Sequence, residues 1–367
     1  MSHLCHPAAI GDIAPAAWDG LNGSEQPFLR HAYLAALESS GSVGVGSGWT
    51  PCPITVENND GNLLAAIPLY EKYDSNGEFI FDWNWAEIYA ASGRDYYPKL
   101  VVAVPYTPVT GPRLLLAPHT DEAIRETLIA HLLDWANARE VSSLHWLFLP
   151  PQELPALEAH DCLVRTGCHF EWHNPGMSHF DDWLATLSSA RRKTIRRERR
   201  RVHEAGIHCE WLSGTELDAD VLATVYELYT ANYHAHGMRP YFTPQFFPTL
   251  AAMLPGALAV CLARRGNETV AGAIFLESDT TLYGRYWGAF EWVNSLHFEV
   301  CYYQGIERAL SRGYTRFHPG VQGEHKLLRG FEPTLHYSAH WLRDVDFRHA
   351  VSGFLTRERT AVGAYAE

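Results

Sequence analysis

The segment from residue 318 to 333 concentrates side chains that can do chemistry. It is written HPGVQGEHKLLRGFEP and places Glu324, His325, Lys326 and Arg329 among three glycines. Glycines let a ligand approach the backbone closely, lysine and arginine bind phosphates or carboxylates, and histidine or glutamate moves protons. We therefore interpret the segment as a candidate site. A solvated charged loop is the alternative.

Two further segments place polar side chains among apolar ones. NSLHFEVCYY contains His297 and Glu299, and the strand-like YGRYWG contains Arg285 and Trp287, which share one face of a strand. A buried Glu299 needs a partner, which Arg285 or Arg329 could supply. Glu299 is thus either a catalytic carboxylate or half of an internal ion pair, and Arg285 is either paired in a core or directed into a pocket.

These segments give a defined set of candidates. The catalytic candidates are Glu299, Glu324 and His325, and the substrate-binding candidates are Arg285, Trp287, His297, His318, Lys326 and Arg329. The histidines and glutamates among them show no HxH or HExxH spacing, so we expect no metal. The chain also has no Walker motif, GxGxxG, GxSxG or kinase signature.

A basic run interrupts an otherwise acidic chain. The formal net charge is -13, yet residues 191–201 (RRKTIRRERRR) hold eight basic residues and one acid, Glu198. Because these cations surround a helix instead of forming a stripe, we expect none of them in a core. Either the helix face is simply solvated, or it binds RNA or a phosphate-bearing donor, and RNA binding there would be strongly salt-dependent. The donor- or RNA-binding candidates are Arg192, Lys193, Arg196, Arg197 and Arg200.

The composition is typical of a globular protein with more than one domain. The chain has 367 residues, which suits two domains, and 47% hydrophobic residues with 12 tryptophans, which suits large cores. The seven cysteines are scattered without a CxxC, as is typical of reduced thiols in a cytosolic protein. We see no apolar run of about 20 residues and no signal peptide, and therefore expect a cytoplasmic protein without a membrane span.

The elements expected to position the candidates follow an α/β order with strands in mixed directions. In the first half we predict helices at 27–39 and 121–139, a hairpin of 52–57 and 63–70 around Asp60-Gly61, and strands at 100–104, 144–149 and 168–172. In the second half we predict one long helix at 180–205, helices at 216–236, 244–254 and 295–312, and strands at 207–212, 257–263, 270–278, 281–289, 315–319 and 334–342. The tail, 343–367, is a terminal helix or a loosely held end. The first half is a weaker version of the second, without a repeat in sequence.

Three segments together resemble a known family. PFLRHAYLAALESSG, YYPKLVVAVPYTPVTGPRLLL and GYTRFHPGVQGEHKLLRGFEPTLHYSAHW are similar to the FemAB-like family of the GNAT superfamily, a proteobacterial family linked to peptidoglycan biosynthesis or recognition. The resemblance spans nearly the whole chain. It implies an α/β (α+β) fold of tandem GNAT-like domains with mixed central sheets flanked by helices. We assign 1–175 to the first domain, 176–206 to a basic connecting helix, and 207–367 to the second domain, which would carry the site.

The resemblance also implies an activity. Fem-type enzymes move an amino acid from aminoacyl-tRNA to an amine of a peptidoglycan precursor, and their late basic residue before a Gly-Phe pair is here Lys326 before Gly330-Phe331. The GNAT pyrophosphate loop would lie at 288–295, where GAFEWVNS lacks the R/QxxGxG pattern, which disfavours acetyl-CoA.

We therefore predict an acyl- or aminoacyltransferase that joins an activated donor, aminoacyl-tRNA or an acyl thioester, to an amine. In this hypothesis Glu299, or Glu324 with His325, handles the proton, while Lys326, Arg329 and Arg285 hold the donor phosphate or the oxyanion. The alternatives are an N-acyltransferase that uses acyl-CoA or an acyl carrier on a small amine, and a non-catalytic ligand-binding protein. We expect no tightly bound cofactor, a small-molecule or peptide amine as acceptor, and tRNA as a candidate partner. The sequence leaves the oligomeric state open.

Overall fold

A computed structural model describes residues 2–23, 26–321 and 323–366. The chain divides into two compact units: unit 1 comprises residues 1–168 and 335–367, and unit 2 comprises residues 169–334. The first boundary lies close to the expected one at 175. However, residues 176–206 belong to unit 2 instead of connecting two domains, and residues 335–367 return to unit 1.

Unit 1 contains two sheets. The smaller sheet is antiparallel and has the order β1 (Ser2–Cys5), β3 (Ile54–Asn58), β4 (Leu63–Ile67) and β7 (Leu115–Leu116). The larger sheet has the order β2 (Trp49–Pro51), β5 (Leu69–Lys72), β6 (Lys99–Val102), β8 (Ser143–Leu149) and the second half of β15 (Glu332–Leu342). Its β6–β8 pair is parallel and its β8–β15 pair is antiparallel, so the sheet is mixed.

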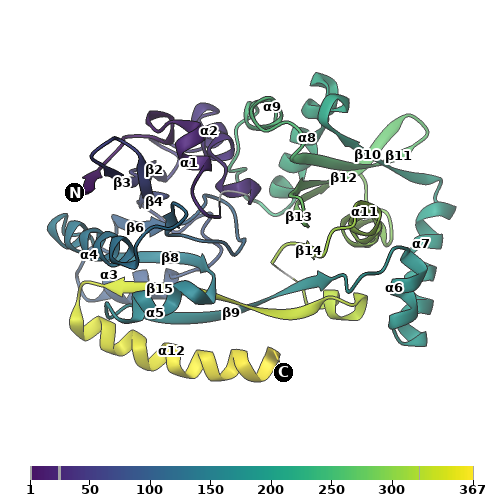
Figure 1. Ribbon diagram of the computed structural model, residues 1–367. Helices are drawn as coiled ribbons and strands as arrows, with labels where there is room; N and C mark the ends of the chain where they lie inside the picture. Colours follow the sequence, from purple (N-terminus) through teal and green to yellow (C-terminus); the bar gives the residue numbers. More distant parts are fainter. Residues whose placement is uncertain (1, 24–25, 322, 367) are drawn as a thin grey trace. The chain divides into compact units, whose positions relative to one another are not determined.

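The helices of unit 1 are α1 (Pro15–Asp19), α2 (His31–Ser39), α3 (Trp83–Ala91), α4 (Glu122–Ala138), α5 (Leu154–Glu158) and α12 (Val345–Ala366), with short 3-10 turns at Ile10–Asp12, Pro27–Leu29 and Pro151–Glu153. Asp121 caps α4 by accepting a hydrogen bond from the Ala123 amide, as an acidic first turn predicts. The terminal helix α12, yellow in Figure 1, buries Val351 and Leu355 in a cluster with Trp85 and Tyr89 of α3. This apolar cluster explains why the tail belongs to unit 1.

Unit 2 is built on one mixed sheet, in the order β10 (Ile207–Ser213), β11 (Leu258–Arg265), β12 (Glu268–Glu277), β13 (Thr281–Ala289), β14 (Arg316–His318) and β9 (Leu163–His173). Only the β13–β14 pair in this order is parallel. The strand β9 begins in unit 1 and ends in unit 2, and β15 does the reverse.

The helices of unit 2 are α6 (Phe180–Thr186), α7 (Ser189–Glu204), α8 (Ala219–Ala235), α9 (Phe246–Met253), α10 (Leu296–Phe298) and α11 (Gln304–Arg312), with 3-10 turns at Gly214–Glu216 and Glu324–Arg329. The helix α8 packs on β13, and α11 packs on β13 and β14 (Figure 1). A π-helical turn, Glu299–Tyr303, joins α10 to α11. The expected two α/β units with mixed sheets and flanking helices are confirmed.

The helix predicted at 180–205 is wrong in one respect, because it is two helices. Leu187 is extended, with φ -87° and ψ 159°, and Ser188 caps α7 by accepting a hydrogen bond from the Arg191 amide. Serine stabilises a helix start more than a helix interior, so the chain breaks there. The break lets α7 turn a new face inward, and Ile195 and Val202 become part of the unit 2 core.

Candidate functional site

The end of β14 and the turn that follows it form the centre of the candidate site in unit 2. Because β13 and β14 are parallel and Tyr283 pairs with His318, their carboxyl ends reach the same edge of the sheet. The chain then turns at Gly320 (φ +89°) and Gly323 (φ +109°) before the 3-10 helix Glu324–Arg329. A side chain at Gly323 would strike the His325 ring, at 2.2 Å, so this turn requires glycine.

Lys326 is the most unusual residue of this turn. Its side chain is buried, with the residue only 1% exposed, and Nζ donates a hydrogen bond to the Gly320 carbonyl oxygen. Among the residues that the structure describes, no carboxylate forms an ion pair with it. Burial therefore lowers the pKa of Lys326 to about 7, opposed only by the neighbouring Cys301. An amine of this kind can be charged or neutral near physiological pH.

His325 lies beside Lys326 and is partly exposed. Its Nε2 forms a hydrogen bond of 2.8 Å with the Tyr302 hydroxyl, and its ring centroid is 6.0 Å from that of His297. Burial, Arg329 and Lys326 all lower the pKa of His325, so its imidazole is neutral near pH 7 and can accept a proton. Glu324, the first residue of the same 3-10 helix, is exposed.

Arg329 has a structural role that differs from the predicted binding of a donor phosphate. Its guanidinium donates to Glu198 Oε1 (2.8 Å), to the Tyr303 hydroxyl (3.0 Å) and to the His325 carbonyl oxygen (2.9 Å). It also stacks over the Phe298 ring at 3.4 Å. With its donors engaged and its face covered, Arg329 fixes the turn in place instead of facing a ligand.

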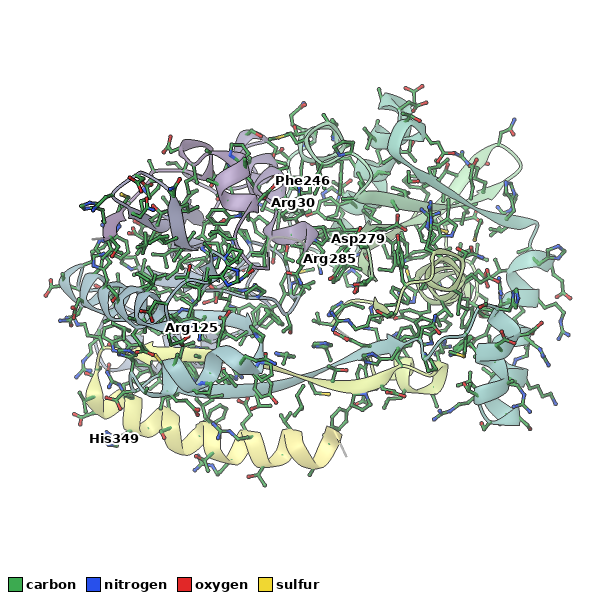
Figure 2. The ribbon with its side chains drawn as sticks, in the orientation of Figure 1. Arg30, Arg125, Phe246, Asp279, Arg285 and His349 are labelled. Carbon is green, nitrogen blue, oxygen red and sulfur yellow. The ribbon has the colours of Figure 1, made fainter. Side chains whose placement is uncertain are left out.

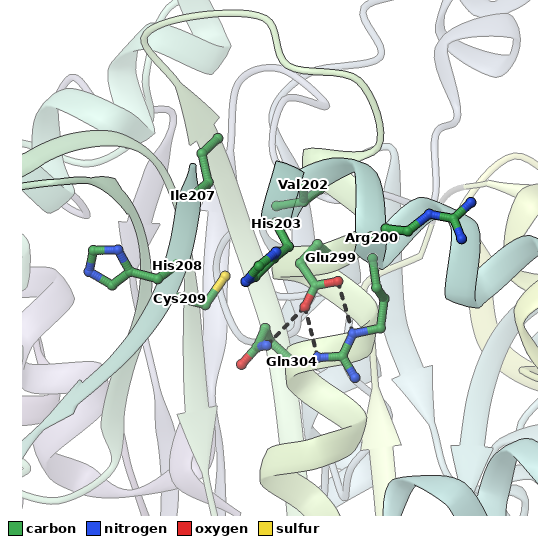
Figure 3. A pocket seen from close by; sticks show the side chains of 9 residues that line it. Arg200, Val202, His203, Ile207, His208, Cys209, Glu299 and Gln304 are labelled. Carbon is green, nitrogen blue, oxygen red and sulfur yellow. Dashed lines mark hydrogen bonds and ion pairs between the residues drawn. The ribbon is translucent and has the colours of Figure 1, made fainter. Parts of the chain in front are cut away.

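Glu299 is likewise part of an internal network, and its partner is neither Arg285 nor Arg329. Arg199 binds the buried carboxylate with two hydrogen bonds, of 3.0 and 3.1 Å, and Gln304 adds a third of 2.9 Å. Figure 3 shows the Glu299 carboxylate held by these bonds at the wall of a cavity of about 440 Å³. This arrangement matches the internal ion pair that the sequence left open.

Arg285, Trp287 and His297 occupy the region where β13 ends. Arg285, labelled in Figure 2, is the extra residue of a β-bulge, because Ile274 pairs with Tyr286 and Phe275 with Gly284. The rings of Trp287 and His297 meet edge to face, with centroids 5.3 Å apart.

Trp287 and His297 both line a cavity of about 500 Å³, which is closed on one side by residues 289–295. Burial, His325, Lys326 and Arg329 lower the pKa of His297 to about 4, so this imidazole is neutral. The cavity wall includes Trp292, which is 85% exposed.

His318 ends β14, next to the turn that holds Lys326. It is buried, its ring centroid is 4.8 Å from that of His169, and the Gly320 amide donates to its Nδ1 at 3.3 Å. His169 in turn binds Glu171, with 2.9 Å between Nε2 and Oε1. The sequence analysis missed His169 and Glu171. Their only signal was a His-x-Glu spacing in a predicted strand, whose partner is distant in sequence.

The five basic candidates share one face of α7, while the other three cations of the run, Arg191, Arg199 and Arg201, lie outside that face. The five candidates line one groove of about 420 Å³ along α7: Arg192, Lys193, Arg196, Arg197 and Arg200. The opposite face is internal, because Glu198 binds Arg329, and Arg199 binds Glu299 and Glu307. Arg199 is half-buried in this ion-pair network, and none of the eight cations of the run is a buried core residue.

Of the helices within residues 2–23, 26–321 and 323–366, none is both long and apolar enough to cross a bilayer. Each of the seven cysteines is a free thiol.

Comparisons with known proteins relate the whole chain to one family. The profile of the FemAB-like family, described as peptidoglycan biosynthesis/recognition, matches residues 9–367. The search of curated proteins found no match.

Three solved structures share the fold across nearly the full length. The C-terminal domain of a putative lysylphosphatidylglycerol synthetase from Agrobacterium fabrum is 10% identical, with a TM-score of 0.54 and 92% of each chain covered. FemX is 11% identical, with a TM-score of 0.53, covering 95% of this chain and 100% of its own. L-PGS from Bacillus licheniformis is 10% identical, with a TM-score of 0.51, covering 88% of this chain and 95% of its own.

Proposed function

The chain belongs to the FemAB-like family, a branch of the GNAT superfamily with tandem GNAT-like units, and on this premise we propose that it is an acyl- or aminoacyltransferase. It would join an activated acyl group to an amine and so form an amide bond. The observation that carries this proposal is Lys326, a buried amine without a carboxylate partner, held by the backbone of a glycine-rich turn. Proteins seldom bury a lysine in this way without a chemical use for it.

Acyl transfer to an amine creates a transient oxyanion, which needs a fixed positive group. Lys326 uses one N–H for the Gly320 carbonyl oxygen and, when protonated, keeps two for an oxyanion. Because the amine is already desolvated and anchored, its interaction with the developing charge needs little reorganisation. Arg285, at the bulge of β13, would assist in holding the donor.

The attacking amine must also lose a proton. We assign this step to His325, with the exposed Glu324 beside it, because the imidazole is neutral near pH 7. The amine nitrogen forms a bond to the ester carbonyl carbon, the bond from that carbon to the donor oxygen breaks, and the departing hydroxyl takes the proton that His325 accepted. Trp287, His297 and His318 are the proposed walls of the substrate site.

Aminoacyl-tRNA is the proposed donor, and an amine of a peptidoglycan precursor is the proposed acceptor. The basic groove of α7 supports the donor, because five cations on one face suit a phosphate backbone. The family description supports the acceptor. Charged tRNA and nucleotide-linked precursors are both cytoplasmic, so we propose that the enzyme works in the cytoplasm, without a tightly bound organic cofactor.

An acyl thioester donor is the second candidate. It is favoured by the cavity of about 500 Å³ beside Trp287 and Phe298, whose aromatic side chains suit an acyl group. The two donors differ in what they require of the protein, because a thioester would fill this cavity and tRNA would need the groove of α7.

A transfer assay tests the proposal. The protein is incubated with a mixture of radiolabelled aminoacyl-tRNAs and a nucleotide-linked muropeptide precursor that carries a free amine, and the labelled amide is detected by mass spectrometry. We expect transfer by the native protein and a loss of 10²-fold or more, as for other oxyanion-stabilising groups, in Lys326→Met. Calorimetry with acetyl-CoA is the parallel arm, and tight binding there would favour the thioester donor. Ligand binding without product in either arm would identify a non-catalytic binding protein.

A further inference from the structure

Three side chains in unit 2 form a buried cluster that shares His318 with the proposed substrate site but contains neither His325 nor Lys326. His169, Glu171 and His318 are 1%, 8% and 2% exposed, and each directs one nitrogen or oxygen atom to a common region. These three atoms all lie within 4.8 Å of one another. Two imidazoles and one carboxylate in this proximity are the ligand set of a transition-metal site.

The register of the sheet brings the three residues together. The strands β9 and β14 are antiparallel, with Arg316 opposite His173 and Phe317 opposite Trp172. The next position in this register puts His318 opposite Glu171, and cross-strand neighbours share one face of a sheet. His169 is two residues from Glu171 along β9 and therefore lies on the same face. The cluster thus sits on regular strands, which position ligands more rigidly than a loop does.

The hydrogen bonding of the cluster is incomplete without a ligand. His318 Nε2 is buried and has no hydrogen-bond partner among the described residues, although buried nitrogens are nearly always bonded. Within the described part of the chain, its ring nitrogens have one hydrogen bond, a long one of 3.3 Å from the Gly320 amide to Nδ1. Across the cluster, His169 Nε2 and Glu171 Oε1 are 2.9 Å apart, so these two atoms would separate by about 0.5 Å to bind one tetrahedral metal ion.

We propose that His169, Glu171 and His318 bind a divalent transition-metal ion, and that this ion is Zn²⁺, with a fourth position open to water or a ligand. Zinc takes His and Glu ligands at about 2.0–2.2 Å in tetrahedral geometry, which places the donor atoms roughly 3.4 Å apart. Small side-chain rotations would bring the three donor atoms, which all lie within 4.8 Å of one another, to this spacing.

Metal binding rearranges two protons. The ion replaces the proton between His169 and Glu171, which passes to solvent. Binding through Nε2 moves the proton of His318 to Nδ1 of the same ring, so the Gly320 amide turns away from that atom. Arg285 and Lys326 contribute positive charge at His318 and oppose a cation, whereas Glu171 favours it. Two neutral imidazoles and a single carboxylate leave the Zn²⁺ site with one net positive charge, which suits an anionic ligand in the open position.

Cobalt and zinc titrations test the site without any assumption about turnover. Protein stripped with a chelator is titrated with Co²⁺, whose visible absorption reports tetrahedral coordination, and then with Zn²⁺ in competition, while elemental analysis counts metal per chain. We expect one ion per chain, and a loss of affinity of at least tenfold in Glu171→Gln and in His318→Ala. His208→Ala, which removes an exposed histidine of β10 in the same unit, serves as the control and should bind as the native protein does.

The result that overturns the proposal is native protein with no saturable Co²⁺ or Zn²⁺ binding, or variants that bind as tightly as the native chain. Glu171→Gln keeps the shape of the side chain and an acceptor for His169, so it decides the question if His318→Ala fails to fold. Because metal binding is measured directly, a failure here leaves the acyl-transfer assay untouched, and a failure of that assay leaves the metal site untouched.

Discussion

Replacing Lys326 with methionine should make the protein more stable and less active at the same time. Methionine fills a similar volume without a charge, so the variant removes a buried amine and keeps the packing. A pKa lowered from 10.5 to about 7 means that burial of the ammonium costs about 5 kcal/mol, at about 1.4 kcal/mol for each tenfold change in proton affinity. The variant also loses the hydrogen bond to Gly320, which offsets about 1–2 kcal/mol of the gain from removing the buried charge. We therefore expect Lys326→Met to raise the free energy of unfolding by about 3 kcal/mol at pH 6.

The stability advantage of Lys326→Met should decrease as the pH rises. Below about pH 7 the amine of Lys326 is protonated in both folded and unfolded chains, so the full cost is present. Between about 7 and 10.5 the unfolded chain binds more protons than the folded one, and the stability of the native protein rises with pH. At pH 9 the remaining cost is about 2 kcal/mol, so the advantage of the variant should shrink to about 1 kcal/mol or less.

Denaturant titrations followed by tryptophan fluorescence at pH 6, 7.5 and 9 measure this difference. Lys193→Met is the matched control, because Lys193 is exposed on α7 and its loss should leave stability unchanged at every pH. In the transfer assay Lys326→Met should lose 10²-fold or more in kcat/KM. In the native protein kcat/KM should fall as the pH rises above about 7, because the charged amine disappears. A variant less stable than the native protein at pH 6, or transfer that does not change, would refute this account of Lys326.

Three further substitutions test the surrounding geometry. Gly288→Ala places a Cβ 1.8 Å from a carbonyl oxygen of α8, so we expect a loss of about 3 kcal/mol in thermal unfolding, and an unchanged Tm would show that α8 can move away. Glu299→Gln leaves Arg199 without its buried partner, and should cost about 3 kcal/mol without altering the pH profile of transfer; an altered profile in folded protein would restore Glu299 as a catalytic group. Arg197→Glu should weaken tRNA binding and flatten its salt dependence, whereas Arg191→Glu, an exposed change outside the groove, should do less; equal effects would argue against the groove as the binding face.

The sequence predicted the elements best where one local pattern determines them. The strand β13 has the expected bounds, Thr281–Ala289, because alternating apolar residues lie between two turns. The same reasoning failed at Ser188, where an apparently continuous helical pattern hides a cap. It also assigned residues 335–367 to the second unit, because chain order does not reveal that β15 pairs with β8.

The sequence predicted the turn at the centre of the candidate site, but not which side chains pair with one another there. The turn around Lys326 was found because glycines and charged residues are adjacent in sequence. The partners of Glu299 and Arg329 were not, because both come from α7, 100 and 131 residues earlier along the chain. His318 was identified, yet its neighbours on β9 appear only when two distant strands are paired. Local composition therefore indicates where chemistry can occur, while tertiary contacts decide which polar residues remain available for it.

The helix α7 shows how these contacts divide the roles of similar residues. Its outer face carries the five cations of the groove, and its inner face carries Glu198 and Arg199, one and two positions from Arg197. Glu198 fixes Arg329, which lies three residues from Lys326 on the same 3-10 helix, so the position of α7 determines that of this turn. A nucleic acid bound on the outer face would thus act on a rigid element that contacts the site directly. Substitutions on that face should change binding alone, whereas substitutions at Glu198 should disturb the turn and the pKa of Lys326 together.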